Sequence, residues 1–181
     1  VKGLMAEMIF YGPLMKNYQV SSVYIGGGTP SSIDEQWIAA LMEGVFDCFN
    51  VLPDAEISIE CNPGTLSREK LLAYRDAGIN RLSIGLQSAN NDELKLLGRI
   101  HTFEQFVTNY EVARNVGFKN INVDLMYGLP GQSASQYMAT VNKIIRLHPD
   151  HISAYSLIVE KGTPFYEKYK FDMVRQEAGM R

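Results

Sequence analysis

Short runs of β-branched and apolar residues alternate with helix-like segments along most of the chain, and this alternation limits the folds open to it. Their first residues lie 33, 26, 39 and 31 positions apart. Each interval is long enough for the helical crossover that joins two parallel strands. The pattern therefore predicts the α/β class with a parallel sheet, and we expect its strands at residues 22–25, 55–60, 81–86, 120–126 and 151–157.

The intervals between these strands carry helix signals. Ser32 and Glu35 predict a capping box at the start of the first of these helices, and Ser67 predicts a cap for the next. In the helix at 33–49, apolar residues recur at helical spacing and should face the core: Ile33, Trp37, Leu41, Val45 and Cys48. The expected helices cover residues 33–49, 68–77, 92–97, 103–116 and 135–147, with part of another at 2–11.

The length of the chain separates a complete barrel from smaller α/β folds. A full (β/α)8 barrel takes about 250 residues, and this chain has 181. One more strand before the first helix would make six strand–helix units. A partial (β/α)6 TIM-like barrel and an open doubly wound sheet both fit this count. Because the chain begins at Val1, we expect a piece of a longer protein, with a barrel domain at 1–165 and the start of a C-terminal segment at 166–181.

Charge and composition exclude several partners. The chain has 17 basic and 20 acidic side chains and a formal net charge of −3. This weak acidic excess offers no basic face to a phosphate backbone, so we expect no nucleic-acid partner. No apolar run reaches the length of a transmembrane helix, about 18 residues, and no secretory signal is visible. Two cysteines do not make a disulfide framework, so we expect a cytoplasmic protein.

Polar or backbone-exposing residues stand where the expected strands end. In a barrel and in an open sheet alike, ligands bind at the carboxyl ends of the parallel strands. We therefore expect one site at this edge. The residues that reach it are Gly26, Gly27, Gly28 and Thr29 after the first strand, Glu60 after the second, Gln87 and Ser88 after the third, and Asp124 in the fourth.

Each of these residues also has a purely structural interpretation. The glycines could bind a phosphate, carboxylate or ammonium group, or form a tight turn; they match neither the P-loop nor the dinucleotide fingerprint. An acid inside a parallel strand is costly unless it is paired or binds a ligand. Glu60 is thus a ligand contact or a solvated edge residue, and Asp124 is a ligand contact or the partner of an arginine.

Two further side chains are candidates with the same ambiguity. Gln87 either hydrogen-bonds a ribose or an amide of a ligand, or is a core amide whose hydrogen bonds are all made within the protein. Arg99 clamps a carboxylate through its planar guanidinium, or is a surface arginine. The histidines at 101, 148 and 151 lack the spacing of a single metal site. Cys48 and Cys61 are too few to hold an iron–sulfur cluster, so the chain itself predicts no metal ligands.

Five segments, in their order and spacing, resemble the radical S-adenosylmethionine (SAM) enzymes of the oxygen-independent coproporphyrinogen III oxidase group. The likeness extends over about residues 4–167, and residues 151–164 are more similar to the haem-chaperone branch of that group than to the true oxidases. The segments are residues 24–30 (YIGGGTP), 59–65 (IECNPGT), 81–88 (RLSIGLQS), 98–101 (GRIH) and 122–131 (NVDLMYGLPG).

The resemblance implies a partial barrel of six units and two cofactors, SAM and a [4Fe-4S] cluster. In the family three cysteines of a C-x3-C-x2-C motif bind the cluster; this chain lacks the motif, which we expect upstream of Val1. Gly27, Gly28 and Thr29 would meet the methionine end of SAM. The remaining contacts implied by the family are Glu60, Gln87, Arg99, Asp124 and, more weakly, the backbone of Ile158.

The resemblance also implies a tetrapyrrole partner, coproporphyrinogen III or haem, without identifying the electron donor. The main expectation is oxidative decarboxylation of coproporphyrinogen III propionates, in which a 5′-deoxyadenosyl radical takes hydrogen and the side chain loses CO2 to become a vinyl group. The alternative is a haem chaperone that binds and delivers haem with little or no turnover. A third hypothesis is a sugar- or nucleotide-handling barrel unrelated to SAM.

Overall fold

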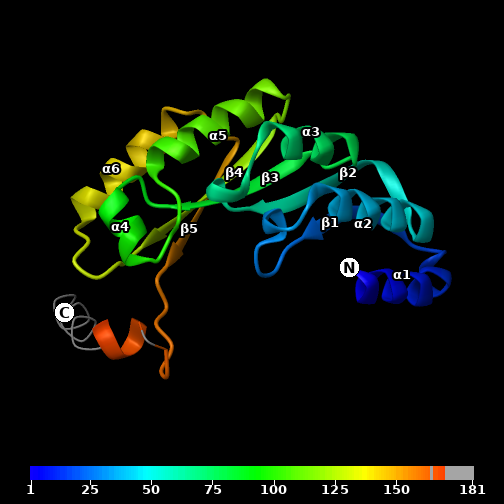
Figure 1. Ribbon diagram of the computed structural model, residues 1–181, viewed down its shortest axis with the longest axis horizontal. Helices are drawn as coiled ribbons and strands as arrows, with labels where there is room; N and C mark the ends of the chain where they lie inside the picture. The colour runs from blue at the N-terminus through cyan, green and yellow to red at the C-terminus, as the bar shows by residue number, and fades with distance from the viewer. Residues whose placement is uncertain (164, 170–181) are drawn as a thin grey trace.

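The chain forms one parallel sheet that curls into an open half-barrel (Figure 1). The computed structural model describes residues 1–163 and 165–169; of the expected C-terminal segment at 166–181, residues 170–181 lie outside the described residues. The strand order follows the chain, and every neighbouring pair is parallel. A doubly wound sheet would reverse its strand order at a switch point. The partial-barrel prediction is therefore confirmed.

All five expected strands are present, and the first two begin earlier than expected. The extension of the second strand includes Pro53, which cannot donate to a strand ladder. It fits because the pairing of the first two strands shifts between Val20 and Ser22. The strands are β1 (Gln19–Ile25), β2 (Asn50–Cys61), β3 (Arg81–Gln87), β4 (Asn120–Tyr127) and β5 (His151–Ser156).

The helices also lie where the helix signals placed them. Ser67 caps α3 by accepting a hydrogen bond from the backbone of Lys70 at 3.2 Å, as expected. None of the helices in the described part of the chain is long and apolar enough to cross a membrane. They are α1 (Lys2–Met15), α2 (Glu35–Cys48), α3 (Arg68–Asp76), α4 (Asn91–Leu96), α5 (Phe103–Asn115) and α6 (Ala134–Ile145).

Two predictions for α2 are wrong, one about its N-terminal cap and one about its buried face. Ser32 does not cap the helix, because it belongs to a 3-10 turn (Pro30–Ser32) and its hydroxyl donates to the Thr29 carbonyl oxygen at 2.7 Å. The buried face is also rotated from the expected one: Trp37 is 45% exposed and Ile33 is exposed as well. The residues of α2 that reach the core are Ile38, Leu41 and Met42, with Val45 partly buried beside them.

The core lies between the sheet and the helices packed against it, and α2, α3, α5 and α6 all contribute buried residues to it (Figure 1). Alternate residues of a strand point to opposite faces, so one residue in two from each central strand enters this core. The other residues point to the concave face of the half-barrel. The fully buried core residues of the central strands are Ile59, Leu82, Ile84, Leu86, Ile121, Val123 and Leu125.

Candidate functional site

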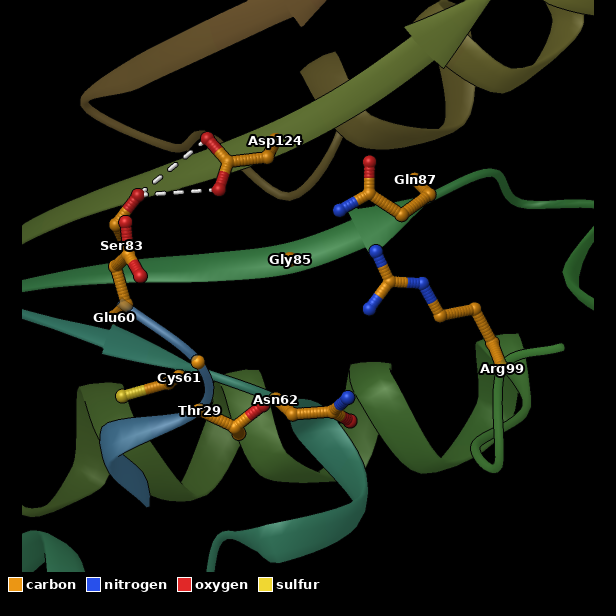
Figure 2. Close-up of a pocket in the computed structure, with 10 residues that line it drawn as sticks. Thr29, Glu60, Cys61, Asn62, Ser83, Gly85, Gln87, Arg99 and Asp124 are labelled. Carbon is orange, nitrogen blue, oxygen red and sulfur yellow. Dashed lines mark hydrogen bonds between the residues drawn. The ribbon is translucent and has the colours of Figure 1, made fainter. Parts of the chain in front are cut away.

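A polar pocket lies on the concave face, at the carboxyl ends of β1 to β4 (Figure 2). Its volume is about 210 Å³. Small-molecule sites commonly measure about 300–1,000 Å³, so this pocket encloses part of a nucleoside-sized ligand and leaves the rest on the open concave face. The lining residues are Gly28, Thr29, Glu60, Cys61, Asn62, Ser83, Gly85, Gln87, Arg99 and Asp124.

Strand register brings these residues together. Glu60 in β2 is in register with Ser83 in β3, and Asp124 in β4 is in register with Ser153 in β5. Residues in register on parallel strands point to the same face of the sheet. Six of the eight predicted site residues line the pocket: Gly28, Thr29, Glu60, Gln87, Arg99 and Asp124.

The glycine loop is tied to the carboxylate of Glu60. The backbone N–H of Gly27 donates to Glu60 Oε2 at 3.1 Å, and the Tyr24 hydroxyl donates to Oε1 at 2.7 Å. A Cβ at Gly26 would lie 2.5 Å from Tyr24 Cε1 and 3.2 Å from Glu60 Cδ, so the loop needs glycine there. The hydrogen bond to Glu60 and burial raise the pKa of Tyr24 to about 12, so its hydroxyl remains a donor at neutral pH.

Asp124 is oriented by two neighbouring side chains. Its carboxylate accepts hydrogen bonds from Asn122 Nδ2 at 2.6 Å and from Ser83 Oγ at 3.2 Å. Burial raises the pKa of Asp124; these two hydrogen bonds oppose that effect, and the negative charge of Glu60 adds to it. The ion pair with an arginine that the sequence left open does not form within the described residues.

Gln87 and Arg99 close the opposite side of the pocket, where their side chains point toward one another (Figure 2). Gln87 is 7% exposed and has a φ of 76°, a conformation that non-glycine residues adopt at a cost of about 1–3 kcal/mol and that clusters at functional sites. Burial lowers the pKa of Arg99, while Asp124 opposes this effect. The Arg99 guanidinium makes no ion pair with any described residue, which leaves its charge available to an anionic group.

Two predicted residues lie outside the pocket lining. Gly27 borders it through the bond to Glu60. Ile158 follows the end of β5 and is 80% exposed, away from the pocket, so its role as a contact stays a prediction. The buried His101 has a structural place: its ring nitrogens lie 3.1 Å from Asn62 Oδ1 and 3.3 Å from the Leu86 carbonyl oxygen, which joins the ends of β2 and β3.

Sequence reasoning missed three residues that orient the predicted ones. Tyr24 bonds Glu60, and Ser83 and Asn122 bond Asp124. The signal was present in the alternation of the strands: polar residues recur at alternate positions leading to the predicted site residue. In β3 these are Arg81, Ser83 and Gln87, with Gly85 between the last two, and in β4 they are Asn120, Asn122 and Asp124.

The donor set fits an organic zwitterion and does not fit an iron–sulfur cluster. No group of three potential metal ligands occurs within residues 1–163 and 165–169. Cys61 is buried, its pKa is raised by burial, and its sulfur points away from the pocket (Figure 2). Backbone carbonyls and a carboxylate suit an ammonium group, and carboxylate and amide groups suit hydroxyls. Arg99, which makes no ion pair with the described residues, suits a carboxylate.

The curled parallel half-barrel, with a polar pocket at its carboxyl rim, defines a member of the β/α-barrel class. Residues 13–144 match the Radical SAM superfamily, and the chain belongs to that superfamily. The resemblance stated from the sequence is thus confirmed. This membership argues against the third hypothesis, a sugar- or nucleotide-handling barrel unrelated to SAM.

The relatives of the chain agree with this assignment. It is 42% identical over 148 residues to "Heme chaperone HemW" of Bacillus subtilis and 40% identical over 147 residues to the protein of that name in Escherichia coli. These alignments cover 81% of this chain and 39% of each relative, so the chain spans about two fifths of their length. The crystal structure of Escherichia coli coproporphyrinogen III oxidase (HemN), described as a radical SAM enzyme, matches 99% of this chain and 44% of that one, with a TM-score of 0.81 and 29% identity.

Proposed function

We propose that this chain is the SAM-binding body of a haem chaperone of the radical SAM superfamily. One observation carries the SAM assignment: residues from four strand ends and Arg99 converge on one polar pocket. The relatives named as haem chaperones, at about 40% identity, favour the chaperone alternative over coproporphyrinogen oxidation. Because the chain spans part of their length, the proposal concerns the whole protein to which it belongs.

Each side of the pocket has a role in this proposal. The Arg99 guanidinium binds the carboxylate of the methionine end, and Glu60 with the backbone of residues 27–29 binds its ammonium group. Asp124 and Gln87 accept or donate hydrogen bonds at the ribose hydroxyls. When bound, SAM supplies the hydrogen-abstracting chemistry of the superfamily. The chain's own residues hold it in one orientation at the rim.

Equilibrium dialysis with labelled SAM tests the binding step. We expect the intact protein to bind SAM and the double variant Glu60→Ala, Asp124→Ala to lose binding. Glu56→Gln is the matched control, because Glu56 lies on the same strand outside the pocket lining and pairs with Arg81 at 3.7 Å. Equal affinity of the double variant and the wild type would contradict the assignment of this pocket.

The cluster ligands stay a prediction for the sequence upstream of Val1. We propose that the intact protein carries one [4Fe-4S] cluster bound there by three cysteines. Iron and acid-labile sulfide measured after anaerobic reconstitution should reach about four of each per protein. Values near zero would mean that the fold is retained without radical chemistry, and binding or delivery of a tetrapyrrole would then be its whole function.

Haem binding separates the two candidate functions. A chaperone should bind haem at a defined stoichiometry, visible as a saturable Soret shift, and should not convert coproporphyrinogen III. The structural match to coproporphyrinogen III oxidase over 99% of the chain favours the second candidate, oxidative decarboxylation. Formation of protoporphyrinogen in an anaerobic incubation with SAM and a reductant would support that candidate and contradict the chaperone proposal. We also propose that the protein is cytoplasmic and that its barrel domain ends at about residue 165, where a C-terminal segment begins.

A further inference from the structure

Asn122 lies at the centre of a polar network on the concave face, two residues before the pocket residue Asp124 on β4. It is 2% exposed and is in register with Ser83 on β3 and His151 on β5. Its Nδ2 lies 2.8 Å from Ser83 Oγ and 2.6 Å from Asp124 Oδ1. Its Oδ1 lies 2.5 Å from His151 Nδ1 and 3.0 Å from Ser153 Oγ. One buried amide therefore contacts polar side chains of three strands.

The chemistry of the partners allows one orientation of this amide. An ionised carboxylate only accepts hydrogen bonds, so the amide nitrogen must face Asp124. The amide oxygen also only accepts, so His151 Nδ1 carries a proton and the Ser153 hydroxyl donates. A flipped amide would place its oxygen against a carboxylate oxygen of Asp124. Asp124 thus sets the amide with its nitrogen toward the pocket, and His151 and Ser153 can both donate to the amide oxygen in that orientation.

We propose that Asn122 is a positioning residue: its amide nitrogen holds the Asp124 carboxylate in the orientation that meets the ligand. The proposal rests on the SAM-binding function for its effect on affinity, and on geometry alone for its effect on Asp124. Asn122 lies outside the pocket lining, so it acts through Asp124 and not by touching the ligand.

Charges on every neighbouring element act on Asp124. Glu60 on β2 opposes its ionisation, and Arg99 in the segment after α4 favours it. Tyr24 on β1 interacts electrostatically with Asp124. On β5, Ser153 favours the ionised form of Asp124, and His151 contacts Asn122. Burial raises the pKa of Asp124, and the Asn122 hydrogen bond is the largest influence that lowers it. Loss of this amide therefore leaves a half-buried carboxylate with its main donor missing.

The direct test follows the Asp124 carboxyl carbon by ¹³C NMR titration of the intact protein, with Asp124→Asn used to identify the signal. In Asn122→Ala we expect Asp124 to titrate at higher pH than in the wild type. Ser83→Ala removes the longer of the two hydrogen bonds and should shift it in the same direction by less, which keeps the test open if Asn122→Ala does not fold. Asn109→Ala is the control, since its amide donates to the Leu66 carbonyl oxygen at 2.8 Å, outside the pocket lining.

The second readout is the affinity for SAM as a function of pH. We expect Asn122→Ala to weaken binding about tenfold at mildly acidic pH, the value of one hydrogen bond to a charged group, and much less at alkaline pH. An unchanged Asp124 titration in folded Asn122→Ala would overturn the inference, as would an unchanged titration in Ser83→Ala if Asn122→Ala does not fold. Failure of the wild-type protein to bind SAM would instead overturn the proposed function, and the titration would still decide the role of Asn122.

Discussion

The two faces of the sheet are made by the same strands and differ in almost every other respect. In β3 and β4 the residues that face the helices are Leu82, Ile84, Ile121 and Val123, all fully buried. Their neighbours on the concave face include Ser83, Asn122 and Asp124, which are joined by hydrogen bonds. The apolar face supplies most of the stability through burial, while the polar face carries carboxylates that burial disfavours.

The difference shows that the concave face contributes less to stability than a fully apolar face would. Buried polar groups are tolerated when they are hydrogen-bonded, and the concave face satisfies them through side chains on adjacent strands. Gln87 adds a strained backbone at the same rim. Substitutions on the two faces should therefore separate stability from ligand binding.

The largest effect is expected on the apolar face. Ile84→Ala should lower the free energy of unfolding by about 3 kcal/mol, because it leaves a cavity in a close-packed core. Urea unfolding followed by circular dichroism measures this change, with Ile84→Val as the matched variant at about 1 kcal/mol. The folded fraction of Ile84→Ala should bind SAM with wild-type affinity; a large loss would mean that the two faces are not separable.

A smaller change in free energy is expected at Asp124, and it should fall on ligand binding rather than on folding stability. Asp124→Asn should weaken SAM binding about tenfold to a hundredfold, the contribution of a hydrogen bond to a charged group. It should leave the free energy of unfolding unchanged or slightly higher, because it removes a carboxylate that burial disfavours. Dialysis and urea unfolding on the same preparation give both quantities. A loss of stability without a loss of affinity would assign Asp124 to the core and not to the site.

The pH dependence should also separate the two faces. Burial raises the pKa of Asp124 above its ordinary value, so the folded protein binds this proton more readily than the unfolded chain does. Acidification through that range should then increase the contribution of Asp124 to the free energy of unfolding, while it lowers the affinity for SAM. We expect a change of about tenfold in affinity, measured by dialysis across the acidic range. Asp124→Asn should make the affinity for SAM nearly independent of pH across this range. An unaltered slope would assign the pH dependence to another group.

The smallest effect is expected at Tyr24, which is exposed and bonds Glu60 from outside the pocket lining. Tyr24→Phe should weaken SAM binding about threefold to tenfold, the net contribution of one ordinary hydrogen bond, about 0.5–1.5 kcal/mol. Tyr18→Phe is a matched control, since Tyr18 is similarly exposed and lies before β1. A loss as large as that of Asp124→Asn would show that Tyr24 contacts the ligand itself.

The errors in the sequence analysis have local physical causes. Ser32 and Glu35 match a capping box, yet Asp34 precedes the first residue of α2 and the Ser32 hydroxyl bonds Thr29. The spacing of Ile33, Trp37 and Leu41 suits a helix, but the face that becomes buried depends on where the sheet lies. Leu41 is buried as expected, while Ile38 and Met42 are buried in place of Ile33 and Trp37. Helical periodicity identifies a helix more securely than it orients one.

The sequence by itself determined the α/β class, the parallel direction of the strands and the edge at which a site would form. Those properties follow from local patterns: strand spacing, alternation within strands and polar residues at strand ends. Only the tertiary structure decided which side chains meet. The bonds from Tyr24 to Glu60 and from Ser83 to Asp124 depend on strand register and on the curl of the sheet. Register joins residues 36 and 41 positions apart in the chain, and no local pattern encodes such a distance.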